Sequence, residues 1–219
     1  MVRSTILFSL LCVLFATTAI ACPGQTGKVI FEDNFADDSG GWKLAPPWAE
    51  IKDGALLLRP DPKGADEAGD PVVELDNITF SAGEADYCVE FIFPKSFAPD
   101  NNVVLSILFL NDLKSVFKLS GSADKTVFLS RWTSTQKVWD RIFTQDNAPT
   151  KVGPGDVNSL RVVAKGGKLA LFLNGQQLKA IRAQTPEGDL RFGLRAEVER
   201  HSQANPVFQV KSFKVTTGQ

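Results

Sequence analysis

The stretch LRVVAKGGKLALFLNGQQLKAI, residues 160–181, decides the fold class. Apolar residues recur at every second position in its second segment, and Gly166-Gly167 and Asn174-Gly175 interrupt the pattern twice. Gly-Gly and Asn-Gly supply the positive φ angles that a two-residue hairpin turn requires. The stretch therefore predicts an antiparallel meander. Its predicted strands are 160–165, 168–173 and 177–181.

The same period of two recurs along the rest of the chain. It is clear in residues 86–93, 103–109 and 190–196. Short alternating segments without helix-period segments between them are typical of half-buried strands. We therefore expect an all-β fold, a sandwich of two antiparallel sheets. Further strands are predicted at 28–31, 54–59, 72–80, 116–119, 126–132, 137–143 and 206–215, and surface loops at 60–71, 94–102 and 146–157.

The first residues have the pattern of an export signal. Arg3 is followed by an apolar run over 6–15, and Ala19-Ile20-Ala21 has the small-x-small form that a signal peptidase cleaves. The run is shorter than the roughly twenty residues that a membrane-spanning helix needs. We expect 1–21 to be a signal peptide, 22–27 a tether and 28–217 a single domain. The mature protein is then exported, periplasmic, extracellular or lipid-anchored in the cell envelope, without a transmembrane segment.

Two cysteines, Cys22 and Cys88, would remain after cleavage, because Cys12 leaves with the signal. They can pair as a disulfide in an oxidising compartment. Alternatively, residues 19–22 resemble a bacterial lipobox, in which Cys22 would carry a lipid anchor. The sequence leaves both alternatives open.

The charge balance excludes several partners. Lys plus Arg number 24 and Asp plus Glu 25, so no overall field attracts nucleic acid. His201 is the single histidine, which excludes metal sites built on several histidines. A catalytic triad would have to use this one residue as its base. The loop over 60–71 is acidic, but its spacing matches no calcium-binding loop. No cofactor is expected, and calcium has no support.

Five segments carry a family resemblance. Residues 31–35 read FEDNF and are followed by SGGW at 39–42. A Trp, an Asp-Gly turn and a Leu follow within 48–56. Hairpin motifs lie within 158–175, and 208–215 resembles a closing strand. Together they resemble the concanavalin A-like lectin/glucanase superfamily over residues 28–216. The resemblance implies a jelly-roll sandwich with ligands on one face or at the edge loops. It identifies a fold better than an activity, because these are core and turn positions.

Within that superfamily the chain is most similar to 3-keto-disaccharide hydrolase-type domains. Asp86-Tyr87 fits the start of their third strand. The Asn-Ser-Gly segment that such proteins carry is Asn102-Val103-Val104 here, which departs from the pattern of the hydrolase.

Candidate catalytic carboxylates are few. Glycosidases need two carboxyl groups on either side of the scissile bond. Glu74 and Asp76 lie two apart on one predicted strand and resemble part of the Glu-x-Asp-x-x-Glu strand of β-glucanases. Thr79 replaces the final Glu of that pattern, so one catalytic carboxylate is missing. An ordinary polar strand face is the alternative interpretation.

The segment SRWTSTQKVWDR, residues 130–141, is the candidate binding site. A turn at 133–136 would place Trp132 and Trp139 opposite each other on adjacent strands, within reach of one sugar chain. Aromatic rings contact the C–H faces of sugars. The alternative is that one ring caps the core and the other shields a sheet edge.

Charged neighbours complete this candidate site. Arg131 and Asp140 are expected to bind sugar hydroxyls beside the two rings. Trp42 and Trp48, in contrast, fall on the superfamily's core motifs, so we expect both to pack in the interior.

Three functions are compatible with the sequence. The first is an exported carbohydrate-binding domain without an intact catalytic set. The second is a glycoside hydrolase or 3-keto-disaccharide hydrolase acting on di- or oligosaccharides. The third is a structural or adhesion module of the cell envelope.

Overall fold

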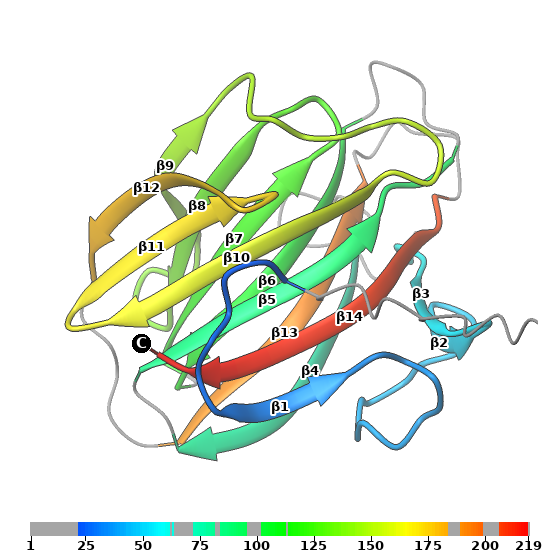
Figure 1. Cartoon of the computed structure of the whole chain (residues 1–219), viewed down its shortest axis with the longest axis horizontal. Coiled ribbons are helices and arrows are strands. Elements are labelled where there is room, and N and C mark those ends of the chain that lie inside the picture. Colours follow the sequence, from blue (N-terminus) through cyan, green and yellow to red (C-terminus); the bar gives the residue numbers. More distant parts are fainter. Residues whose placement is uncertain are drawn as a thin grey trace, which may run out of the picture.

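The computed structural model describes residues 22–61, 63, 72–81, 84–95, 102–112, 114–183, 189–198 and 206–218. Within these ranges the regular elements are fourteen strands, which form two antiparallel sheets packed face to face (Figure 1). In the same ranges no helix is long and apolar enough to cross a membrane. The predicted all-β sandwich is confirmed.

The larger sheet, sheet A, has eight strands. Their order is β12 (Gln176–Arg182), β11 (Lys168–Leu173), β10 (Val157–Lys165), β5 (Ala85–Ile92), β14 (Phe208–Thr217), β3 (Ala55–Leu58) and β2 (Ala49–Lys52), and β1 (Val29–Asp33) pairs with the other half of β14. The predicted meander forms one side of this sheet. Gly166, Gly167, Asn174 and Gly175 all have positive φ angles, as their hairpin turns require.

The smaller sheet, sheet B, has six strands. Their order is β4 (Val72–Ser81), β13 (Asp189–Val198), β6 (Val103–Asn111), β7 (Ser115–Ser122), β8 (Val127–Thr133) and β9 (Trp139–Gln145). The strands from β6 to β9 follow one another in the chain and in space, whereas β4 and β13 are brought in from distant segments. The alternating sequence pattern predicted the individual strands. It did not predict their pairing, because several neighbours in the sheets are far apart in the sequence.

The core lies between the sheets and is filled by alternate residues of each strand. One part of it is aromatic: the rings of Phe192 and Phe213 stack 4.9 Å apart, and Trp42 meets both edge-on. The indole of Trp42 donates to the buried carboxylate of Asp33 at 2.8 Å. The interior placement predicted for Trp42 is confirmed, and Trp48 packs against the core half-buried.

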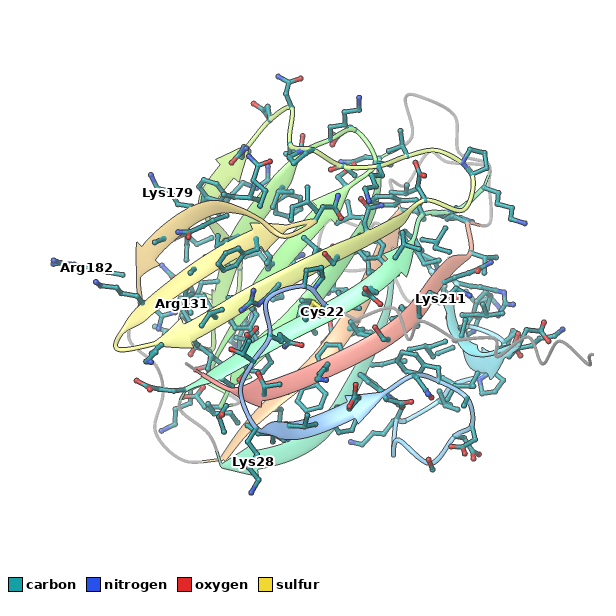
Figure 2. The ribbon with its side chains drawn as sticks, in the orientation of Figure 1. Cys22, Lys28, Arg131, Lys179, Arg182 and Lys211 are labelled. Atoms are coloured by element: carbon teal, nitrogen blue, oxygen red, sulfur yellow. A yellow bond between two sulfur atoms is a disulfide. The ribbon has the colours of Figure 1, made fainter. Side chains whose placement is uncertain are left out.

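The N-terminal segment 22–27 crosses the outer face of sheet A (Figure 2). Cys22 forms a disulfide with Cys88 of β5. Arg161 of β10 donates to the backbone carbonyls of Pro23 and Gly24, at 3.1 and 2.8 Å, and forms an ion pair with Asp86 at 2.7 Å. The segment predicted as a tether is thus bound to the sheet. Of the two alternatives for Cys22, the structure has the disulfide, and a lipid thioether would need the same sulfur atom.

Several predicted boundaries shift. The strand predicted at 137–143 is β9 at Trp139–Gln145, because β8 ends one residue later than predicted and the turn that follows is one residue longer. The short strand β2 was not predicted, since four residues give too little alternation to detect. The predicted loops 60–71 and 94–102 lie largely outside the described residues, and so does the predicted signal peptide 1–21.

Candidate functional site

The outer face of sheet B, turned away from sheet A, carries a network of charged side chains. On β13, Leu194, Ala196 and Val198 point into the core, so Arg195 and Glu197 between them point outward. Outward positions of a strand are usually solvated. Here, however, both charged side chains are largely covered.

Four of these charged groups form a continuous chain of ion pairs. Arg195 Nη2 lies 2.7 Å from Glu197 Oε1, and Arg195 Nη1 lies 3.1 Å from Glu74 Oε2 on β4. Lys118 Nζ on β7 donates to both carboxylate oxygens of Glu197 at 3.1 and 3.2 Å. The side chains of Arg195 and Lys118 are only 7% and 6% exposed. Desolvated pairs of this kind hold their geometry better than exposed ones.

The charge of Arg195 is stabilised by its neighbours. Burial works against the charged form, but the carboxylates of Glu197 and Glu74 more than offset this, and the pKa of the guanidinium lies above its usual value. Arg195 therefore remains a cation and fixes both carboxylates in place.

Trp139, the first residue of β9, extends over this network. The Lys118 ammonium lies 4.5 Å from the centre of the indole, and the Arg195 guanidinium lies 6.0 Å from it. These are cation–π contacts, which are stronger for tryptophan than for other aromatic residues. The two cations thereby hold the ring above the sheet instead of leaving it to rotate in solvent.

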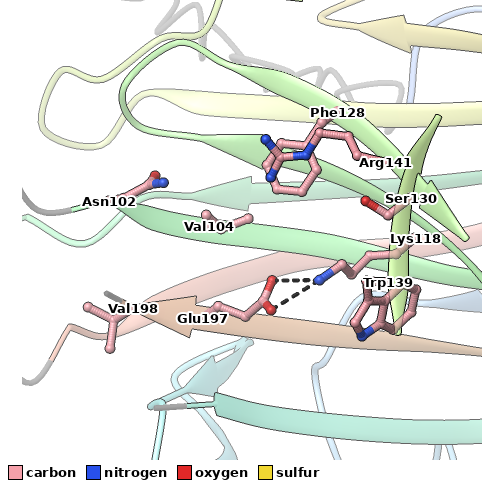
Figure 3. A pocket seen from close by; sticks show the side chains of 9 residues that line it. All are labelled: Asn102, Val104, Lys118, Phe128, Ser130, Trp139, Arg141, Glu197 and Val198. Atoms are coloured by element: carbon pink, nitrogen blue, oxygen red, sulfur yellow. Dashed lines mark hydrogen bonds and ion pairs between the residues drawn. The ribbon is translucent and has the colours of Figure 1, made fainter. Parts of the chain in front are cut away.

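A pocket of about 340 Å³ opens beside Trp139 on this outer face (Figure 3). Its polar lining comes from five strands or strand ends: Asn102, Lys118, Ser130, Arg141 and Glu197. Figure 3 shows the Lys118–Glu197 ion pair at its floor. The volume is at the lower end of the range for small-molecule sites.

A second ring, Phe128 on β8, lines the same pocket. The guanidinium of Arg141 lies 4.3 Å from the centre of the Phe128 ring. Stacking on an aromatic face keeps the guanidinium plane in one orientation. The pocket thus presents two rings and several fixed donors and acceptors.

The predicted tryptophan pair exists. Trp132 and Trp139 are direct partners across the β8–β9 hairpin, so they share the outer face of sheet B. Neither ring belongs to the core cluster among the described residues, although both are partly buried. Their placement favours a surface role over the core-capping alternative.

The structure separates Arg131 and Asp140 from these rings. They pair with each other across the same hairpin, one position along from the tryptophans, and successive residues of a strand face opposite sides. Arg131 lies over Phe117 at the edge between the two sheets, near β12 (Figure 2). The four-residue platform expected from the sequence is therefore not one surface. Arg141, two residues after Trp139, shares the pocket instead.

Of the two candidate catalytic carboxylates, Glu74 and Asp76, the structure describes the side chain of Glu74 alone. Glu74 is 41% exposed on its side chain and forms an ion pair with Arg195. The side chain of Asp76 lies outside the described residues, as does His201. Of the acidic loop at 60–71, only Pro60, Asp61 and Lys63 are described. Where the structure is described, no three His, Cys, Asp or Glu side chains form a group that could hold a metal ion.

Solved structures with this architecture are numerous. The catalytic domain of an endo-1,3-β-glucanase (laminarinase) from Thermotoga petrophila superposes with a TM-score of 0.65 at 10% identity, covering 89% of this chain and 99% of that one. The carbohydrate recognition domain of Emp46p gives 0.67 at 11% identity, with 89% and 100% covered. The fold is the concanavalin A-like jelly roll.

A carbohydrate-binding module, CBM66 from Bacillus subtilis, is also similar, with a TM-score of 0.58 at 13% identity over 81% of this chain and 96% of that one. No protein-family model and no curated protein matches the sequence. The predicted superfamily resemblance is thus confirmed for the fold. These neighbours are carbohydrate-binding or glycoside hydrolase-type sandwiches.

Sequence reasoning missed the ion-pair network. Lys118, Arg195 and Glu197 were part of alternating strands, and each alone is typical of a solvated strand face. The available signal was that Arg195 and Glu197 occupy consecutive outward positions of a strand rich in apolar residues. Only the strand order of sheet B shows that Lys118 and Glu74 reach them.

Proposed function

We propose that this domain binds a carbohydrate on the outer face of sheet B, in the pocket beside Trp139. One observation carries the proposal: a tryptophan ring held by two cations borders a pocket in which Lys118 and Glu197 are fixed in an ion pair. Sugars need a flat apolar surface for their C–H faces and fixed donors and acceptors for their hydroxyls. A site that is ordered before binding loses less entropy when the ligand arrives.

The architecture and the disulfide support the proposal. The structural neighbours include a carbohydrate-binding module and a carbohydrate recognition domain. The Cys22–Cys88 bond supports export, because disulfides persist outside the reducing cytosol. We propose that the domain acts in the periplasm or outside the cell.

The first experiment is a glycan array on the purified mature chain, residues 22–219, run beside a reducing-sugar release assay. We expect binding without release of reducing ends. Release would support a glycoside hydrolase, for which Glu74 would be the first carboxylate to replace. An array without any bound glycan would contradict the proposal and favour a structural or adhesion module.

Replacing Trp139 by alanine should weaken glycan binding by about 1–3 kcal/mol, the size of a moderate binding hot spot. The melting temperature should fall much less than for a core truncation, because the ring is outside the core and its two cation–π contacts contribute on the order of 0.5–2 kcal/mol each. Trp132→Ala should also weaken binding, since the two rings are neighbours. Isothermal titration calorimetry and thermal melts measure the two quantities.

The matched control is Trp42→Ala, which truncates a core ring. It should cost about 3–5 kcal/mol of stability without a specific effect on the affinity of the folded fraction. If Trp139→Ala behaved like Trp42→Ala, with lost stability and unchanged affinity, the pocket beside Trp139 would not be the binding site.

A further inference from the structure

Within the part of the chain that the structure describes, Arg141 differs from the other cations of the pocket in having no acidic partner. Lys118 is matched by Glu197, and Arg195 by Glu197 and Glu74. No carboxylate of the described residues lies within ion-pair distance of the Arg141 guanidinium. This guanidinium lies over the face of the Phe128 ring, 4.3 Å from the ring centre.

The position of Arg141 is set by the hairpin. It pairs with Ser130 of β8, which pairs in turn with Lys118 of β7, so the three side chains form one row across the outer face. Stacking on Phe128 covers one face of the guanidinium and leaves the N–H groups at its edge. Figure 3 shows this edge on the opposite side of the pocket from the Lys118–Glu197 pair.

A planar guanidinium with its edge exposed matches the geometry of carboxylate and sulfate groups, which it binds through two parallel hydrogen bonds. We propose that the glycan bound at this pocket is acidic, with a carboxylate or sulfate group on the sugar that pairs with Arg141. This inference rests on the proposed function and names the class of its ligand. The sugar ring would contact Trp139, while its hydroxyl groups meet Lys118, Glu197 and Ser130.

The test compares acidic polysaccharides with matched neutral ones at 0.15 M salt, where non-specific attraction is screened. The pairs are polygalacturonate against its carboxyl-reduced form, and dextran sulfate against dextran. The purified mature protein should bind at least one acidic member about tenfold or more tightly than its neutral partner, the size of a charge-assisted hydrogen-bonded pair. The pair that shows the preference identifies carboxylate or sulfate as the group recognised.

Two variants with the same charge change separate specific recognition from general attraction. Arg141→Gln should abolish the preference for the acidic member, because it removes the charge that pairs with the acidic group. Arg182→Gln removes an exposed cation from the end of β12, outside this pocket, and should leave the preference intact. Thermal melts should show both variants folded, since both side chains are exposed.

The outcomes distinguish the two proposals. Equal affinity for acidic and neutral members overturns the acidic class but leaves carbohydrate binding standing. Equal losses in Arg141→Gln and Arg182→Gln overturn it as well, because the preference then reflects net charge. If neither these polysaccharides nor any glycan on the array binds, both proposals fail.

Discussion

Replacing Cys88 by serine is expected to lower the free energy of unfolding by about 4 kcal/mol. The Cys22–Cys88 bond joins residues 66 apart in sequence, and closing a loop of that length restricts the unfolded chain by roughly this amount. Without the bond, segment 22–27 is held by hydrogen bonds, among them those to Arg161, Asp86 and Lys214. Urea unfolding of the mature chain, extrapolated to water, measures the change.

Two controls belong with this prediction. Cys22→Ser and the double variant should lose as much as Cys88→Ser, because each breaks the same bond. Reduction of the wild type should reproduce the loss without any substitution. A loss below about 1 kcal/mol in all of these forms would show that the bond contributes little, as happens where the unfolded state retains structure.

Replacing Arg195 by methionine should be the second large effect, about 3 kcal/mol or more. The substitution leaves Glu197, only 13% exposed, with Lys118 alone, and it removes the partner of Glu74. Removing one cation from a buried network is costly because the carboxylates that it faced keep their desolvation penalty with less compensation. Chemical unfolding measures the stability, and binding should weaken too, since Trp139 loses one of its two cations.

The comparison with a double variant sharpens this prediction. Arg195→Met combined with Lys118→Met should cost more than Arg195→Met alone, because Glu197 then keeps neither of its two cations. Lys214→Ala is the control: it breaks the pair with Glu32, whose side chain is 49% exposed, and should cost less than about 1 kcal/mol. Equal costs for Arg195→Met and Lys214→Ala would contradict the structural role of the network.

The fold was largely predictable from the sequence, and the reason is local. A period of two together with Gly-Gly and Asn-Gly turns specifies strands and hairpins within a few residues of chain. The meander at 160–181 and the turn between β8 and β9 were therefore predicted. The pairing of Cys22 with Cys88 was predicted only as one of two alternatives, because disulfide formation depends on a distance across the sheet that no local pattern contains.

Only the part of the candidate site that lies within one hairpin could be predicted from the sequence, because local patterns do not specify contacts between distant strands. Trp132 and Trp139 belong to one hairpin, so their cross-strand pairing followed from the turn. Arg131 and Asp140 were assigned to the same surface, although adjacent strand residues face opposite ways. Lys118 and Glu197 are 79 residues apart in sequence, and the order of strands in sheet B alone makes them neighbours.

The disulfide between Cys22 and Cys88 also fixes on which side of the domain the N-terminal segment lies, relative to the pocket. The chain enters the sandwich over the outer face of sheet A, and the pocket beside Trp139 opens on the outer face of sheet B. Cys22 and the pocket thus lie on opposite faces of the sandwich, with the core between them. A surface that met the domain at the outer face of sheet A would therefore leave the pocket open on the opposite side.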